Sequence, residues 1–237
     1  MTQVKSLSLA LIGLFVLLLV TSCSRPIDLA RLSEDDVAEL LEATLSQANG
    51  GLTENLESLT EHIDNLTLED LCDQEFRDSL DFARQGHAGE AAYSASWTLD
   101  LSCTQLNVPE MGSVSTSSQN SYETPRISST GSSAFAGSVS GLQPLQANMI
   151  WEGSYQKSGT QVLQFEQENT ISSTLDLTLV ELSIGKLDTH IHGGTGSFSM
   201  HVSKDEHTST YAGTIVFHGD DTATIVLNGV SYPIHLQ

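Results

Sequence analysis

Hydrophobic residues are spaced differently in the two parts of this chain, and the change lies near residue 90. Before that point they recur every three or four positions, which is the period of a helix. We expect three helices there, beginning at Ser33, Glu54 and Thr67. Residues 33–36 resemble a capping box, and the glycine pair at 50–51 is typical of a helix end. The first part of the chain is therefore predicted to be helical.

After Ala91 hydrophobic and polar residues alternate, which is the period of a half-buried strand. Further strand candidates lie between turn signals: Ser133–Gly141, Asn148–Gln156, Gln161–Glu168, Ser173–Ile184, Lys186–His192, Gly196–Val202, Thr210–His218, Thr222–Leu227 and Val230–Leu236. Asn228-Gly229 predicts a type I′ hairpin, and a slip of the apolar phase between Leu179 and Val180 predicts a β-bulge. The expected fold is α+β and mainly β, with short N-terminal helices before an antiparallel β-sandwich or a meander barrel.

Residues 112–132 interrupt the alternation, because they contain eight serines and three threonines. Val114 and Ile127 are the only aliphatic residues among them. This composition is typical of an exposed or disordered loop. An extended edge strand is the alternative, since Tyr122 and Pro125 also supply apolar anchors.

The first 22 residues have the pattern of a secretory signal. Lys5 precedes an apolar run of 14 residues, Leu7–Val20, which is too short to span a hydrocarbon layer of ~30 Å. The run ends in Val20-Thr21-Ser22-Cys23, which resembles a bacterial lipobox. At such a site the Cys23 thiol takes a diacylglycerol group, and the chain is cut before Cys23. The alternative is an ordinary secretory signal with a chance cysteine.

Lipidation at Cys23 would anchor the mature chain to a lipid membrane, because each buried CH₂ contributes ~0.8 kcal/mol. Ser24 stands where an Asp would resemble the inner-membrane retention signal of many Gram-negative bacteria. We therefore expect attachment to the outer membrane, on either its periplasmic or its surface side.

These patterns divide the chain into four segments. A lipoprotein signal peptide at 1–22 precedes a lipidated tether at 23–32. An acidic helical segment follows at 33–86, and an antiparallel β domain at 87–237 contains the Ser/Thr-rich loop.

Cys72 and Cys103 are the remaining cysteines. In an oxidising envelope such a pair is expected to form a disulfide, which would close a loop of about 30 residues and contribute roughly 3–4 kcal/mol. A reactive dithiol is the alternative, although no Cys-x-x-Cys occurs. Cys72 is predicted on the third helix and Cys103 at the end of the first strand, so the bridge would join helices to sheet.

The chain is strongly acidic, with 9 Lys+Arg against 30 Asp+Glu and a net charge of −21. This balance excludes a nucleic-acid partner, because no basic surface exists to neutralise phosphates. Fifteen of the acids lie between Glu34 and Asp81, where Arg77 is the only Lys or Arg. They indicate either a surface for calcium or a cationic partner, or a solvated helical face; no EF-hand loop is present.

Motifs for known catalytic mechanisms are absent. Residues 137–141 place Val139 where a nucleophile elbow needs serine, residues 193–196 lack the lysine of a P-loop, and no HExxH occurs. Asp220-Asp221 beside Gly219 is interpreted as a hairpin turn. Two function classes remain: a non-enzymatic envelope lipoprotein that binds a partner or ligand or has a structural role, and a metal-binding protein or metal-dependent enzyme.

The second class depends on a set of histidines. Asp188, His190 and His192 occupy alternate positions of a predicted strand, so they would share one face. If residues 193–196 form a hairpin loop, His201 lies opposite Asp188. Imidazoles two residues apart have Cβ atoms ~6.6 Å apart and can converge on one zinc ion, with Asp188 or His201 as third ligand. The alternative is that these histidines face water on the wet side of a sheet.

This chain resembles uncharacterised lipoproteins of Bacteroidota. The resemblance lies in the lipobox start, in the Ser-rich segment around 122–126, and in the ending at 213–217 and 228–232. The resemblance covers most of the mature chain. It implies an envelope address and a β-rich fold, and it offers no catalytic residues to transfer.

Overall fold

The computed structural model describes residues 32–66, 72, 74–86, 89–163, 169–205 and 207–237. The predicted signal peptide, the lipobox with Cys23, the tether before Leu32 and the start of the predicted third helix at Thr67 lie outside the described residues. None of the helices in the described part has the length and apolar composition of a membrane-spanning segment.

Two helices and a short 3-10 turn come first in the described chain. They are α2 (Glu34–Leu45), η1 (Gln47–Asn49) and α3 (Leu52–Asp64). The predicted capping box is confirmed, because the Asp36 amide donates to Ser33 Oγ at 3.2 Å and the Ser33 amide donates to the Asp36 carboxylate at 3.2 Å. Gly50 adopts φ 64°, the left-handed conformation that allows the chain to turn between η1 and α3.

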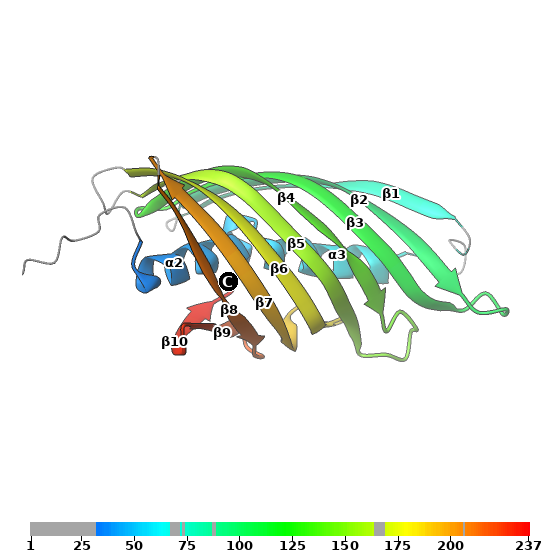
Figure 1. Ribbon diagram of the computed structural model, residues 1–237. Coiled ribbons are helices and arrows are strands. Elements are labelled where there is room, and N and C mark those ends of the chain that lie inside the picture. The colour runs from blue at the N-terminus through cyan, green and yellow to red at the C-terminus, as the bar shows by residue number, and fades with distance from the viewer. Residues whose placement is uncertain (1–31, 67–71, 73, 87–88, 164–168, 206) are drawn as a thin grey trace, which may run out of the picture. The chain divides into compact units, whose positions relative to one another are not determined.

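Ten antiparallel strands follow, and each pairs with the next in sequence to form a single meander sheet (Figure 1). They are β1 (Glu75–Gly86), β2 (Gly89–Cys103), β3 (Pro109–Glu123), β4 (Ile127–Ser140), β5 (Asn148–Leu163), β6 (Asn169–Gly185), β7 (Ile191–Lys204), β8 (His207–Phe217), β9 (Thr222–Leu227) and β10 (Val230–His235). The mainly β fold with N-terminal helices is confirmed. All strands belong to one sheet, and no pairing in the described residues closes it between β1 and β10.

The predicted third helix is wrong over Glu75–Gly86, which forms β1 and pairs along its whole length with β2. Phe76 and Leu80 are four residues apart, so they fit one face of a helix. They are also an even number of residues apart, so they fit one face of a strand equally well. Pairing with β2 decides between the two periods, and the acidic helical segment therefore ends before β1.

The Ser/Thr-rich loop predicted at 112–132 is also wrong, because these residues lie in β3 and β4 except for the turn at 124–126 that joins the two strands. Both strands are central, since β2 pairs with β3 and β5 pairs with β4, so the edge-strand alternative is wrong too. Small hydroxyl side chains face the interior here, and Ser118 Oγ lies 2.6 Å from Ser133 Oγ. Cross-strand pairing satisfies the backbone, which composition alone does not reveal.

Other boundaries differ in detail. β5 is one strand across the break predicted near residue 158. The strand predicted at Lys186–His192 is wrong over 186–190, because residues 186–188 form a turn and β7 begins only at Ile191. The Asn228-Gly229 hairpin is confirmed, with φ 50° and 84°. The predicted β-bulge is confirmed as a register shift between Val180 and Ser183.

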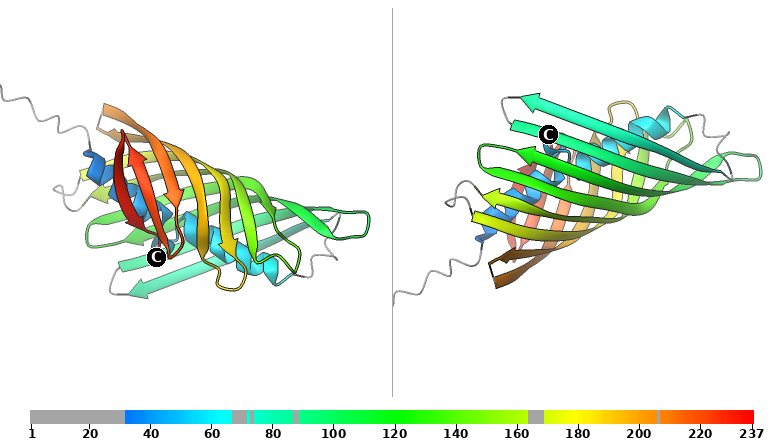
Figure 2. Two further views of the ribbon diagram at one scale, coloured as in Figure 1. Left: turned by 90° about the horizontal axis from the view of Figure 1, so that it is seen from below. Right: turned by 90° about the horizontal axis from the view of Figure 1, so that it is seen from above.

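The sheet curves around α2 and α3, which lie along one of its faces (Figures 1 and 2). We call this the inner face and the opposite one the outer face. One apolar core joins the helices to the inner face. Two polar contacts fix α3 within it: Trp151 Nε1 donates to Thr60 Oγ1 at 3.1 Å, and Asn55 Nδ2 donates to Thr116 Oγ1 at 3.3 Å.

Glycines allow β4 and β5 to approach closely where the sheet bends. Gly131 pairs with Gly159, and Gly137 pairs with Gly153. A Cβ on Gly137 would lie 2.1 Å from the Glu152 carbonyl oxygen, and one on Gly131 would lie 2.4 Å from that of Ser158. These paired glycines act as kinks that let the sheet curl around the helices.

The disulfide between Cys72 and Cys103 is confirmed, with Cα atoms 5.8 Å apart. Cys72 is not helical as predicted; it forms an isolated parallel bridge with Leu101. The bond therefore ties the segment between α3 and β1 to the end of β2.

Candidate metal centre

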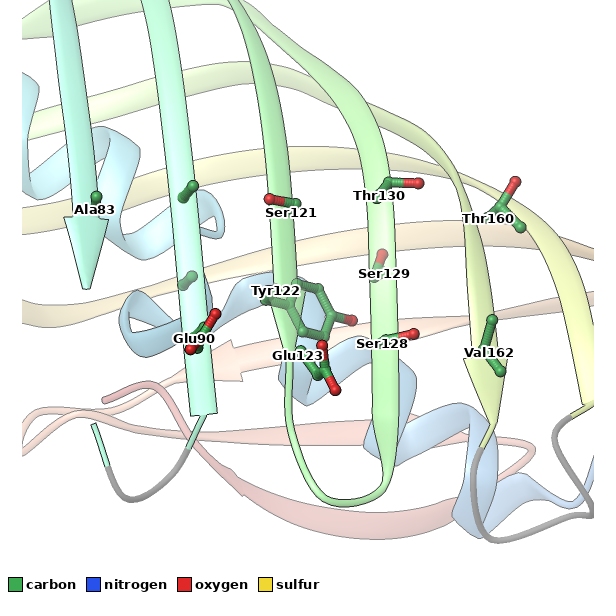
Figure 3. Close-up of a pocket in the computed structure, with 12 residues that line it drawn as sticks. Ala83, Glu90, Ser121, Tyr122, Glu123, Ser128, Ser129, Thr130, Thr160 and Val162 are labelled. Atoms are coloured by element: carbon green, nitrogen blue, oxygen red, sulfur yellow. The ribbon is translucent and has the colours of Figure 1, made fainter. Parts of the chain in front are cut away.

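Several features of the described structure offer room or donor atoms for a ligand, and two of them contain residues of interest. The first is a cavity of about 630 Å³ near one end of β2–β5 (Figure 3). Hydroxyl side chains such as Ser128, Thr130 and Thr160 line it, together with Glu90 and Glu123. The second is a group of donors from a helix and two turns, which includes one of the histidines singled out in the sequence.

The predicted set of Asp188, His190, His192 and His201 does not come together. Residues 193–196 lie within β7 rather than in a hairpin loop, so the predicted register is wrong. His201 lies in the middle of β7, where its Nδ1 is 2.9 Å from Thr210 Oγ1 on β8. It therefore contributes nothing to the other three residues.

Asp188 and His192 form a pair of their own at the β6–β7 turn. His192 Nε2 lies 2.8 Å from Asp188 Oδ2, and this hydrogen bond is the main reason that the pKa of Asp188 is lowered. A Cβ on Gly185 would lie 2.0 Å from Asp188 Oδ1 and 2.9 Å from the His192 ring, so the missing side chain makes room for the pair. Both side chains are exposed, and each is the hydrogen-bond partner of the other.

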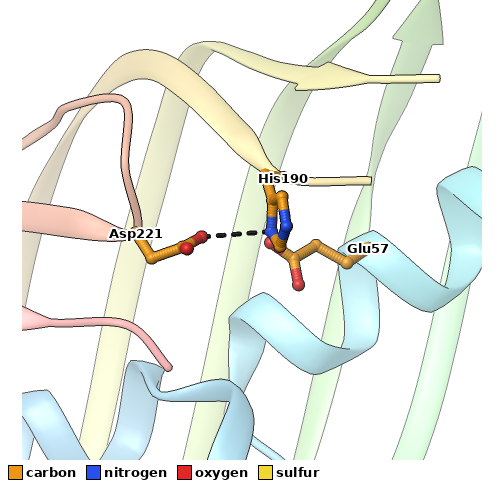
Figure 4. A group of neighbouring side chains, drawn as sticks. All are labelled: Glu57, His190 and Asp221. Carbon is orange, nitrogen blue, oxygen red and sulfur yellow. Dashed lines mark ion pairs between the residues drawn. The ribbon is translucent and has the colours of Figure 1, made fainter. Parts of the chain in front are cut away.

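His190 instead joins Glu57 and Asp221 (Figure 4). One donor atom from each residue lies within 4.8 Å of the other two. His190 Nδ1 is 3.2 Å from Asp221 Oδ1, although the pair lacks the alignment of a hydrogen bond. Glu57 comes from α3, His190 from the β6–β7 turn and Asp221 from the β8–β9 turn. We call these three residues the metal-site triad.

The β8–β9 turn holds Asp221 in place. Asp220 and Asp221 have φ values of 62° and 54°, and the His218 amide donates to the Thr222 carbonyl oxygen at 2.9 Å. These values place both aspartates in the left-handed region, within the loop 219–221 that joins the paired ends of β8 and β9. The hairpin turn predicted at Asp220-Asp221 is confirmed, and the Asp221 side chain also serves the triad. The C-terminal segment supports the turn, since the Leu236 amide donates to the Asp221 carbonyl oxygen at 2.8 Å.

Glu57 is the most unusual member of the triad. Its side chain is buried, with 4% of the residue exposed. Gln47 Nε2 donates to its Oε2 at 2.9 Å, and the Ile191 amide also interacts with the carboxylate. Among the described residues, no group forms a close hydrogen bond with its Oε1. Burial raises the pKa of Glu57 to about 8, and repulsion from Asp221 and Glu54 adds to the effect. A carboxylate in this position is stabilised by a cation or else retains its proton at neutral pH.

One imidazole and two carboxylates form a donor set that suits first-row divalent cations such as zinc. Glu57 closes the inner side of the triad. The side chains of His190 and Asp221 are 42% and 19% exposed, so the other side is open to solvent. An ion here could keep a water molecule as its fourth ligand, and it would connect α3 to two turns of the sheet.

Sequence reasoning identified His190 but missed its two partners. Glu57 was one of many acids on a predicted solvated helix, and Asp221 was interpreted only as a turn residue. No local pattern distinguishes either from its neighbours, because their meeting depends on how α3 lies against the sheet.

No protein-family model, curated protein or solved structure matches this chain. The resemblance to Bacteroidota lipoproteins stays a prediction. The interpretation of the metal-site triad therefore rests on the geometry of the chain's own residues.

Proposed function

We propose that this protein is a lipid-anchored lipoprotein of the bacterial envelope that binds a divalent cation at Glu57, His190 and Asp221 and does not act as an enzyme. The observation that carries the cation site is the buried Glu57 carboxylate, whose Oε1 forms no close hydrogen bond with the described residues and which lies next to a second carboxylate and an imidazole. Burial of such a group is costly unless a cation or a proton neutralises it.

A bound ion would have a structural effect, because its ligands come from three separate elements. It would join α3 to the β6–β7 and β8–β9 turns, and it would bind the folded chain far better than the unfolded one. Such an ion stabilises the fold by ~2.7 kcal/mol when its free concentration is 100 times its dissociation constant. This role explains the site without requiring any catalytic group.

The envelope address rests on the lipobox at Val20–Cys23 and on Ser24. The Cys72–Cys103 disulfide supports it, since such bonds persist in oxidising compartments and are rare in the cytosol. In this proposal an acylated Cys23 anchors the chain in the outer membrane, and the folded part binds its cation and any envelope protein partner.

Zinc titration of the acylated, detergent-purified protein tests the cation site. We expect the thermal midpoint to rise with free zinc in the wild type and not to rise in His190→Ala. His201→Ala is the matched control, because His201 lies on the same sheet outside the triad, and it should respond like the wild type. An unchanged wild-type midpoint at millimolar zinc would exclude the site.

A further inference from the structure

The two margins of the sheet, β1 and β10, differ in how their free edges are protected (Figure 2). β10 is six residues long, Pro233 within it has no amide to donate, and the His235 amide donates to Glu42 on α2 at 3.2 Å. β1 is twelve residues long and contains no proline, and no strand in the described residues pairs with its far side. Because an exposed edge offers unpaired backbone groups to another chain, β1 is where this sheet can be extended.

The backbone of β1 is regular enough to accept a further strand. All twelve of its residues pair with β2 without a register shift. Gly86 and Gly89 close the two-residue connection to β2, so the even-numbered residues of β1 direct their backbone groups to β2 and the odd-numbered ones to the free edge. Ser79 is one of the latter, and its amide donates to the adjacent Asp78 carboxylate at 2.8 Å. This contact is local and exposed, so a carbonyl oxygen of an added strand can replace it.

The apolar side chains of β1 are incompletely covered. Phe76 and Leu80 pack against the core on the inner face, but each is only half-buried. One strand further in, Trp97 on β2 is 1% exposed, and its ring centre lies 5.4 Å from that of Phe76. The difference arises because β2 has a strand on either side and β1 has one. A strand added beside β1 would remove the remaining apolar surface of Phe76 and Leu80 from water.

The sequence of β1 is complementary to itself. When two copies of the strand run antiparallel about a two-fold axis at Ser79, each residue faces the one equally distant from Ser79 on the other copy. Arg77 then faces Asp81, and Phe76 faces residue 82, which is also a phenylalanine. Symmetry makes each of these pairs occur twice. Opposite charges and paired aromatic residues are the cross-strand neighbours that stabilise a sheet.

Neighbouring registers lose this complementarity. A two-fold axis at Arg77 or at Asp81 places that charge opposite its own copy. An axis at Asp78 places Glu75 opposite Asp81, and an axis at Leu80 leaves Arg77 opposite an alanine. Like charges directly opposite each other destabilise a pair of strands, so the register centred on Ser79 is favoured. Arg77 already pairs with Glu75 in the single chain, but its side chain is 73% exposed and stands at the open edge.

We propose that β1 pairs with β1 of a second copy of this chain about a two-fold axis at Ser79, so that a symmetric dimer contains one continuous sheet. A second copy is the occupant because one strand supplies both halves of each charge pair. With a net charge of −21, two copies repel each other over most of their surfaces, so contact is favoured where both signs occur. The interface is separate from the metal-site triad, whose residues come from α3 and from the β6–β7 and β8–β9 turns.

Oxidative cross-linking of the detergent-purified, full-length Ser79→Cys variant tests the register. Cα atoms that face each other in a hydrogen-bonded antiparallel pair are ~5.5 Å apart, which a disulfide can bridge, so we expect a covalent dimer on a non-reducing gel. Ser96→Cys is the matched control, because Ser96 pairs with Ser79 on β2 and is also exposed. Its two copies would lie three strand spacings apart, ~14 Å, and should not cross-link. Equal cross-linking of both variants, or none at Ser79→Cys, would overturn the proposal.

Charge reversal tests the same interface without a new cysteine. Sedimentation velocity should show that Arg77→Asp and Asp81→Arg each weaken the dimer roughly ten- to hundredfold, because two attractive pairs become repulsive. The double variant should restore the affinity of the wild type. Both residues are exposed, so the thermal midpoints of all variants should stay near that of the wild type. A monomeric wild type, single variants that dimerise normally, or a double variant no tighter than the single ones would each refute the pairing. None of these results would affect the zinc response of the metal-site triad.

Discussion

Replacing Glu57 by glutamine should make the metal-free protein more stable at neutral pH, although the change removes a buried native carboxyl group. Glutamine has nearly the same shape, and its carbonyl oxygen can still accept the hydrogen bond from Gln47. It cannot ionise, so it avoids the cost of placing a carboxylate near Asp221 in a buried site. The expected gain has a definite dependence on pH.

The magnitude follows from the raised pKa of Glu57, which is about 8 in the folded chain against an ordinary 4.5. Below pH 4.5 both folded and unfolded chains hold the proton, and Glu57 contributes nothing to the pH dependence. As pH rises from 4.5 towards 8, the unfolded chain loses the proton while the folded chain keeps it, so the free energy of unfolding falls. At ~1.4 kcal/mol per pH unit, the cost at pH 7 is roughly 3 kcal/mol.

The assay is urea unfolding of wild type and Glu57→Gln in chelator at pH 4.5, 6 and 7. We expect nearly equal stability at pH 4.5 and a gain of roughly 3 kcal/mol for the variant at pH 7, or about 6–12 °C in the thermal midpoint. Glu61→Gln is the matched control, because Glu61 is an exposed acid on the same helix, and it should change stability by less than ~0.5 kcal/mol. Saturating zinc should stabilise the wild type and leave Glu57→Gln unchanged.

Two results would refute this reasoning. If Glu57→Gln is less stable than the wild type in chelator at pH 7, the buried Glu57 carboxylate does not destabilise the folded protein. If the difference between the two proteins does not change with pH, ionisation of Glu57 is not its cause.

Further predictions concern the anchor, the disulfide and the bend in the sheet. Cys23→Ala should leave the protein unprocessed or in the soluble periplasmic fraction, and a processed variant that still partitions into detergent would contradict lipidation at Cys23. Replacing Cys72 and Cys103 by alanine should lower the free energy of unfolding by roughly 3–4 kcal/mol, measured with urea, whereas a loss near zero would show that the bond adds little. Gly137→Ala should destabilise the fold by more than ~2 kcal/mol, because its Cβ would overlap the Glu152 carbonyl oxygen; unchanged unfolding would mean that the strands can separate there.

The sequence by itself determined the features that depend on neighbouring residues. The capping box at Ser33 and the hairpin at Asn228-Gly229 were predicted correctly, because each needs only a few consecutive side chains. The antiparallel character of the second part of the chain followed from its two-residue period. The disulfide was predicted from two remaining cysteines in a chain whose first residues predict a secretory signal.

The tertiary structure alone decided β1 and the Ser-rich strands. Phe76 and Leu80 fit a helix and a strand equally well, so only the presence of β2 beside them selects the strand. The serines of β3 and β4 lack the bulk that marks a half-buried strand, yet Ser118, Ser129 and Ser133 are buried on the inner face of the sheet while the serines between them face outward. Local propensity is weak in both cases, and pairing outweighs it.

The metal-site triad shows the same division between what neighbouring residues determine and what only the tertiary structure decides. His190 was identified because a histidine two residues from another suggests a shared ligand, but its true partners come from α3 and from the β8–β9 turn. Glu57 and Asp221 reach it only because the sheet curls around α3. The spacing of residues along one strand is fixed by backbone geometry and can be read from a sequence, whereas the meeting of three separate elements depends on how the whole core packs.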